Sequence, residues 1–158
     1  MSETATSTID KILARPRLIY AAAVGLFLAD RALKRLVIEL TGHPYGGRLV
    51  SFELFLNRGI AFSLPLPAAI FWPLAALAFT VLVGMSFLIW RDLRYRRLLP
   101  LLIIILLGAV SNLWDRLVVG ATVDYLIFFR LSAINLADIM IIGGLLFLLL
   151  GARDKNKR

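Results

Sequence analysis

Residues 98–119 read LLPLLIIILLGAVSNLWDRLVV, and this stretch decides the fold class. A helix needs about 20 mostly apolar residues to cross a hydrocarbon core of about 30 Å. The whole stretch, residues 98–119, is long enough and mostly apolar, but its end carries Asn112, Asp115 and Arg116. The stretch therefore predicts a membrane helix that holds polar side chains near one of its two ends.

Three further apolar stretches, residues 18–40, 68–90 and 134–150, are predicted as membrane spans on the same grounds. Of the 158 residues 60% are hydrophobic, which excludes an ordinary soluble domain with its usual 45–50%. We predict an all-α membrane protein in which residues 1–158 form one membrane-embedded domain with four transmembrane helices. Residues 1–12, rich in Ser and Thr, are expected to be disordered.

The basic residues predict the orientation, because cytoplasmic flanks carry the excess of Lys and Arg. Eleven of the 18 lie in the N-terminal segment, the connection of residues 91–97 and the C-terminal tail. Three lie in the other connections, so both termini are expected to be cytoplasmic. The net charge of +8 then reflects topology and contact with membrane lipids, and no nucleic-acid partner is expected.

The chain has no cysteine and a single histidine, His43, in a turn beside Pro44. These counts exclude a thiol nucleophile and argue against a cysteine or histidine metal centre. No metal and no cofactor are expected. The two outer connections contain apolar stretches. SFELFL, from Ser51, alternates in the manner of a strand, and DYLIFF, from Asp124, is predicted as a short amphipathic interfacial element.

Three aspartates, Asp30, Asp115 and Asp138, fall inside predicted spans, where an ionisable residue indicates a functional site by default. Asp115 and Asp138 lie at matched depth near the outer ends of two consecutive helices. Each has an asparagine three residues before it, Asn112 and Asn135, which places amide and carboxylate on one helix face. We therefore predict one pocket in which the two carboxylates share a proton, as in aspartic proteases.

A structural interpretation stands beside this prediction. Arg116 is the neighbour of Asp115 and could neutralise it, and Lys34 lies four residues after Asp30, the spacing of an intrahelical ion pair. Two other functions also stay open. One is a small proton-coupled carrier that uses the three aspartates as a relay, and the other is a non-catalytic protein that binds lipidated peptides.

Four blocks of the sequence resemble the lipoprotein signal peptidase (signal peptidase II) family of bacterial membrane aspartic proteases. The blocks are Asp30-x-x-x-Lys34, NRGIAFS at 57–63, GAVSNLWDRLVVGATVDY at 108–125 and INLAD at 134–138. Ile134 stands where the family usually has phenylalanine, and Thr122 where a hydrophobic residue is usual. These departures bear on substrate and inhibitor preference.

The resemblance implies a multi-pass protein of the bacterial inner membrane with its active site toward the periplasm. It implies that Asp115 and Asp138 are the catalytic dyad. Its implied substrates are diacylglyceryl-modified prolipoproteins, cut just before the lipidated cysteine, and globomycin-type peptides are its implied inhibitors. It also implies a small periplasmic β-like cradle, which we place at SFELFLNRGIAF, and an interfacial helix, which we place at DYLIFF. We expect a monomer. The residues expected to bind substrate or support the dyad are Asn57, Gly59, Asn112, Arg116, Asn135, Asp30, Lys34 and Asp124.

Overall fold

The computed structural model describes residues 11, 13–40, 44–60 and 64–153, with side chains as far as residue 150. The predicted disorder of residues 1–12 therefore falls, apart from Lys11, outside the described residues, as does the predicted turn position of His43.

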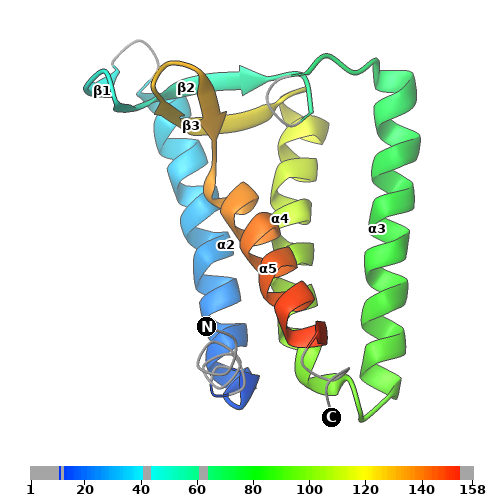
Figure 1. Ribbon diagram of the computed structural model, residues 1–158. Coiled ribbons are helices and arrows are strands. Elements are labelled where there is room, and N and C mark those ends of the chain that lie inside the picture. Colours follow the sequence, from blue (N-terminus) through cyan, green and yellow to red (C-terminus); the bar gives the residue numbers. More distant parts are fainter. Residues whose placement is uncertain (1–10, 12, 41–43, 61–63, 154–158) are drawn as a thin grey trace.

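Four long helices appear where apolar spans were predicted. They are α2 (Pro16–Glu39), α3 (Ala68–Arg91), α4 (Leu99–Val118) and α5 (Leu136–Arg153). A short 3-10 turn, η2 (Arg96–Leu98), leads into α4. Pro16 and Pro100 stand in the first turns of α2 and α4, where the missing N–H of proline is tolerated. In Figure 1 the helices stand side by side, and a small sheet lies across one end of them.

Two segments in the described part of the chain are long and apolar enough to cross a membrane, Ala68–Arg91 and Arg96–Val118. The apolar stretch of α5, Leu136–Leu150, is shorter. No residue of α3 is buried within the protein, and most of its apolar side chains are exposed. An all-round apolar, exposed helix of this kind is typical of contact with lipid.

The sheet has four antiparallel strands in the order β1-β2-β3-β4. Their bounds are β1 Tyr45–Gly46, β2 Val50–Asn57, β3 Thr122–Phe128 and β4 Ser132–Ile134. Strand β2 confirms the strand predicted at SFELFL. It pairs with β3 from Val50 opposite Phe128 to Asn57 opposite Thr122.

The prediction of an interfacial helix at DYLIFF was wrong, because this segment is β3, hydrogen-bonded to β2 on one side and β4 on the other. Gly120, with φ of +78°, follows the end of α4 in a left-handed conformation that suits glycine, and the chain reverses there into β3. Val123 and Tyr125 of β3 are buried and pack with Val37 of α2. This packing fixes the sheet to the C-terminal end of α2.

Candidate active site

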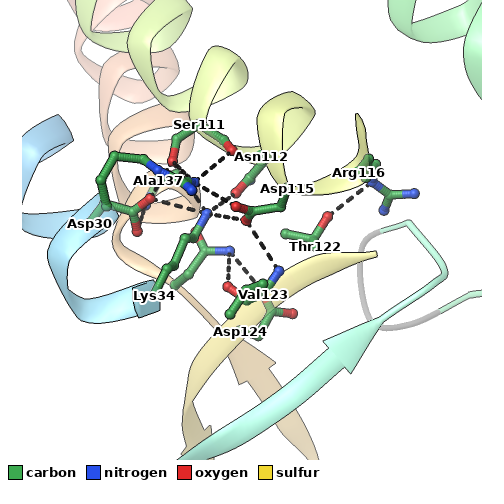
Figure 2. Close-up of polar contacts among 12 residues, drawn as sticks. Asp30, Lys34, Ser111, Asn112, Asp115, Arg116, Thr122, Val123, Asp124 and Ala137 are labelled. Carbon is green, nitrogen blue, oxygen red and sulfur yellow. Dashed lines mark hydrogen bonds and ion pairs between the residues drawn. The ribbon is translucent and has the colours of Figure 1, made fainter. Parts of the chain in front are cut away.

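Asp115 is 1% exposed and belongs to an ionic cluster, whose other members are Asp30, Arg31 and Lys34. One of its carboxylate oxygens is 2.5 Å from Arg31 Nη1, and the other is 2.7 Å from Lys34 Nζ. The backbone N–H of Val123 also donates to Asp115, over 3.2 Å. Figure 2 shows the Asp115 carboxylate turned toward Lys34 and Val123. Asp115 thus joins α2, α4 and β3.

Asp30 completes the cluster and is fully buried. It forms the predicted ion pair with Lys34, at 3.0 Å, which confirms the intrahelical spacing argument. The hydroxyls of Ser111 and Tyr125 donate to it over 2.5 Å and 3.0 Å, and the backbone N–H of Ala137 over 3.2 Å. Each aspartate of the cluster therefore has a cation as partner.

A separate cavity of about 420 Å³ lies between α3, α4 and α5 under the sheet. Most of its lining is apolar, with Phe71, Phe79 and Leu82 from α3, and Ile141 from α5 among the contributors. The acidic residues that line it are Asp124 of β3 and Asp138 of α5. The remaining polar lining residues are Asn57, Asn112, Arg116, Thr122 and Ser132.

Asn135 positions both of these carboxylates. Its side-chain oxygen accepts from the backbone N–H of Asp138, and its own backbone N–H donates to the Asp138 carboxylate. This reciprocal arrangement is a capping box at the first turn of α5. The Asn135 amide nitrogen also donates to Asp124 over 2.6 Å. One buried side chain thereby holds the strand aspartate beside the helix aspartate.

Two other asparagines orient the cavity carboxylates. Asn57 accepts a hydrogen bond from the Gly59 N–H, and its amide nitrogen donates to Asp124 over 3.1 Å. Asn112 donates to Asp138 over 2.8 Å, and its oxygen accepts from Lys34 over 2.8 Å. Asn112 is thus the bridge between the ionic cluster and the cavity.

Arg116 points away from Asp115, as Figure 2 shows. Its guanidinium donates to Thr122 Oγ1 over 2.9 Å and to the carbonyl oxygen of Gly59. It also lies over the Phe71 ring, 4.0 Å from the centroid. Such a contact is a cation–π interaction, which strengthens when it is desolvated. Arg116 therefore ties α3, α4, β3 and the segment after β2 together around the cavity.

The structure differs from the prediction of a shared Asp115–Asp138 pocket. Asp138 lines the cavity, but Asp115 faces α2 and does not. The carboxylate that accompanies Asp138 in the cavity is Asp124, which the sequence placed among the supporting residues. Of the other predicted residues, Asn57, Asn112 and Arg116 line the cavity. The others do not line the cavity. Asn135, Gly59 and Lys34 hydrogen-bond to residues that line it, and Asp30 is connected to it through Lys34.

Burial raises the pKa of Asp124 from the usual 3.8 to about 6. Its hydrogen bond from Asn57 opposes this rise, and the negative charge of Asp138 adds to it. A carboxyl whose pKa lies near 6 can take up and release a proton close to neutral pH, as general acid–base catalysis requires.

Several residues with defined roles in the site carry no signal that the sequence patterns revealed. Arg31 and Ser111 neutralise and hold the ionic cluster, Tyr125 connects Asp30 to the backbone N–H of Leu136, and Phe71 carries Arg116. Arg31 directly follows Asp30, and Tyr125 directly follows Asp124. Their position next to a candidate aspartate is the sequence signal that could have identified them. Nothing in the sequence pattern of α3 distinguishes Phe71.

The fold is that of known bacterial membrane enzymes. A solved structure described as a bacterial membrane enzyme superposes with a TM-score of 0.73, at 18% identity and covering 90% of each chain. A second one gives a TM-score of 0.68 at 18% identity, covering 88% of this chain and 92% of the other. These likenesses establish the fold.

Sequence comparisons establish the family. The model of the signal peptidase (SPase) II family matches residues 22–152. A lipoprotein signal peptidase of Vibrio campbellii is 32% identical, over 85% of this chain and 88% of its own. One of a Sulfurovum species is 31% identical, over 75% and 81%. The chain therefore belongs to the signal peptidase II family. It is a membrane protein and a protease of the kind that removes signal peptides from prolipoproteins.

Proposed function

We propose that this protein is an intramembrane aspartic endopeptidase in which Asp124 and Asp138 form the catalytic pair. The observation that supports the proposal is their position as the acidic lining residues of one largely apolar cavity. Neutral amide groups hold both of them, and Asp138 acts electrostatically on Asp124. Two carboxyls coupled in this way share one proton, because both cannot easily be ionised together.

The shared proton divides the chemistry between the two carboxyls. The ionised one takes a proton from water, whose oxygen attacks the scissile carbonyl carbon. The protonated one donates a hydrogen bond to the carbonyl oxygen as negative charge develops there. The tetrahedral intermediate then collapses with cleavage of the C–N bond, and a proton from the pair passes to the departing amine. No further reactant besides water is needed.

The substrate of this proposal is a prolipoprotein whose cysteine carries a diacylglyceryl group, cut just before that cysteine. The apolar faces of α3 and α5 along the cavity suit a signal helix that enters from the bilayer. The diacylglyceryl chains can stay in lipid while the scissile peptide reaches Asp124 and Asp138. All four helices then cross the bacterial inner membrane, with both termini cytoplasmic and the sheet on the periplasmic side.

The test is cleavage of a synthetic diacylglyceryl-modified precursor by the purified full chain, with the products identified by mass spectrometry. We expect one cut, on the N-terminal side of the lipidated cysteine, and no cut in the precursor without the lipid. Asp138→Asn should abolish cleavage. Asp92→Asn is the matched control, because Asp92 is an exposed carboxylate between α3 and η2. Full activity of Asp138→Asn would refute the pair, and tight binding of the precursor without turnover by the unaltered chain would refute the enzyme.

A further inference from the structure

A second hollow lies on the surface of the protein, between α2 and α4. It shares no lining residue with the cavity of Asp124 and Asp138. Its volume is about 440 Å³. We call it the α2–α4 groove. Its lining residues are Phe27, Leu28, Arg31, Ala32, Arg35, Val110 and Trp114.

The groove is polar at one end and apolar at the other, along the direction of the helices. Arg35 lies four residues before the end of α2, and Trp114 lies four residues before the end of α4. At 1.5 Å per residue both are about 6 Å from the sheet-side ends of their helices. Phe27 lies about 18 Å from the same end of α2 by the same measure. A phospholipid has this order of polarity, with its phosphate at the interface and its acyl chains below.

The groove also carries an unbalanced positive charge. Arg31 and Lys34 are matched by Asp30 and Asp115 in the ionic cluster. Arg35 is exposed and takes part in no ion pair in the part of the chain that the structure describes, although Glu39 lies four residues further along α2. A guanidinium on the lipid-facing side of a membrane helix is costly unless it finds a partner.

Arg31 can help Arg35 to bind a negatively charged partner in the groove. Its Nη1 makes the contacts with Asp115 and Ser111, and its side chain stays 23% exposed at the groove. The planar guanidinium offers five N–H donors in a fork that suits phosphate oxygens. Arg31 and Arg35 are one helical turn apart on α2, which places them on the same face.

We propose that the α2–α4 groove binds an anionic phospholipid of the surrounding membrane. Its phosphate lies against Arg35 and the free edge of Arg31, and one acyl chain follows Phe27, Leu28 and Val110. The uncompensated charge of Arg35 favours an anionic headgroup over a zwitterionic one, which already carries its own cation. The bound phosphate contacts Arg31, which is the ion-pair partner of Asp115 on α4. The lipid therefore stabilises the packing of α2 on α4.

Trp114 provides a local probe of the groove. In a Trp72→Phe/Trp90→Phe background it is the only tryptophan of the chain. We would reconstitute this protein in nanodiscs of phosphatidylcholine and replace an equal mole fraction of lipid either by phosphatidylglycerol with brominated acyl chains or by brominated phosphatidylcholine. The proposal predicts at least twofold greater quenching of Trp114 fluorescence by the brominated phosphatidylglycerol.

Two variants complete the experiment. Arg35→Gln should bring the ratio of the two quenching efficiencies close to one. Arg48→Gln should leave it unchanged, because Arg48 is an exposed arginine of the sheet end that does not line the groove. Equal quenching by both lipids in the unaltered groove would overturn the proposal, and so would a preference that survives Arg35→Gln. Protection of Trp114 from both lipids would show that a second copy of the chain covers the groove, which also overturns it. Cleavage activity enters none of these readouts, so the proposed function stands or falls separately.

Discussion

Replacing Asp115 and Asp124 by asparagine, one at a time, should separate stability from catalysis. Both carboxylates are 1% exposed, so simple burial does not distinguish them. Their partners do, because Asp115 contacts two cations and Asp124 contacts two neutral amides.

Asp115→Asn should unfold readily and still cleave. The change removes the carboxylate that pairs with Arg31 and leaves Lys34 with Asp30 alone. Breaking a buried ion pair by removal of one partner costs about 3–5 kcal/mol. At about 2–4 °C per kcal/mol for a chain of this size, the midpoint of thermal unfolding should fall by at least about 6 °C. Activity per folded molecule should stay within about tenfold, the equivalent of 1.4 kcal/mol.

Asp124→Asn should show the opposite behaviour. The rise of the Asp124 pKa from 3.8 to about 6 means that its ionised form costs the folded state about 3 kcal/mol at neutral pH. Asparagine removes that cost. The amide of the new asparagine has one acceptor oxygen, which can accept a hydrogen bond from either Asn57 or Asn135 but not from both. One hydrogen bond, worth about 1–2 kcal/mol, is therefore lost. The folded state should therefore be as stable as the original or slightly more so, while loss of a general acid–base group reduces kcat by about 10²–10⁴-fold or more.

Two measurements on the same detergent preparations decide the matter. Tryptophan fluorescence during heating gives the unfolding midpoint, and cleavage of the lipidated precursor below that midpoint gives kcat and KM. If Asp115→Asn were inactive at unchanged stability while Asp124→Asn retained activity, the assignment of roles would be reversed and Asp115 would be the partner of Asp138.

The stability of the protein should also depend on pH through Asp124 and on the close contact between α4 and α5 at Gly108. Because the folded state binds the Asp124 proton more tightly than the unfolded state, the free energy of unfolding should fall as the pH rises from about 4 to about 6, and thermal unfolding across this range should lose that slope in Asp124→Asn. Gly108→Ala should destabilise the protein by about 1–3 kcal/mol, because its Cβ would lie 2.7 Å from the carbonyl oxygen of Ala137 on α5. Gly143→Ala, which meets nothing within 4 Å, is the control, and equal unfolding midpoints for the two variants would contradict this close helix contact.

The sequence predicted the helices well, because long apolar runs report directly on burial in lipid or protein. The predicted span of residues 68–90 became Ala68–Arg91, and residues 98–119 became Leu99–Val118. Strand β2 was found by its alternation. Strand β3 was missed, because DYLIFF becomes a strand through pairing with β2 and β4, and local pattern does not contain that pairing.

The candidate site was predicted in composition but not in arrangement. The depth of a carboxylate in the membrane can be predicted from its position along a helix, but the direction it faces also depends on the rotation of the helix about its axis. On α4 the pair Ser111 and Asp115 faces α2, and the neighbouring pair Asn112 and Arg116 faces the cavity. Asp124 lies outside any apolar span, so a search within the spans passed it by.

The two Asn-x-x-Asp units also proved unequal. Asn135 and Asp138 form a capping box at the start of α5, so their spacing has a local structural cause. Asn112 and Asp115 lie inside α4, and their side chains reach different partners. Similar sequence motifs therefore placed one aspartate in the cavity and the other in the ionic cluster.

The difference between cationic and neutral partners explains how four carboxylates, three of them buried and Asp138 half-buried, can coexist at one end of this protein. Arg31 and Lys34 of α2 are the ion-pair partners of Asp115, and Lys34 is also the partner of Asp30, so these carboxylates help to hold α2 against α4. An amide donor fixes the position of a carboxylate and compensates its burial much less, which leaves Asp124 able to hold a proton near pH 6. Asn112 connects the two groups, because the ammonium of Lys34 orients the amide that donates to Asp138. The ionic cluster thus supplies rigidity to the cavity without pairing one of its own cations with Asp124 or Asp138.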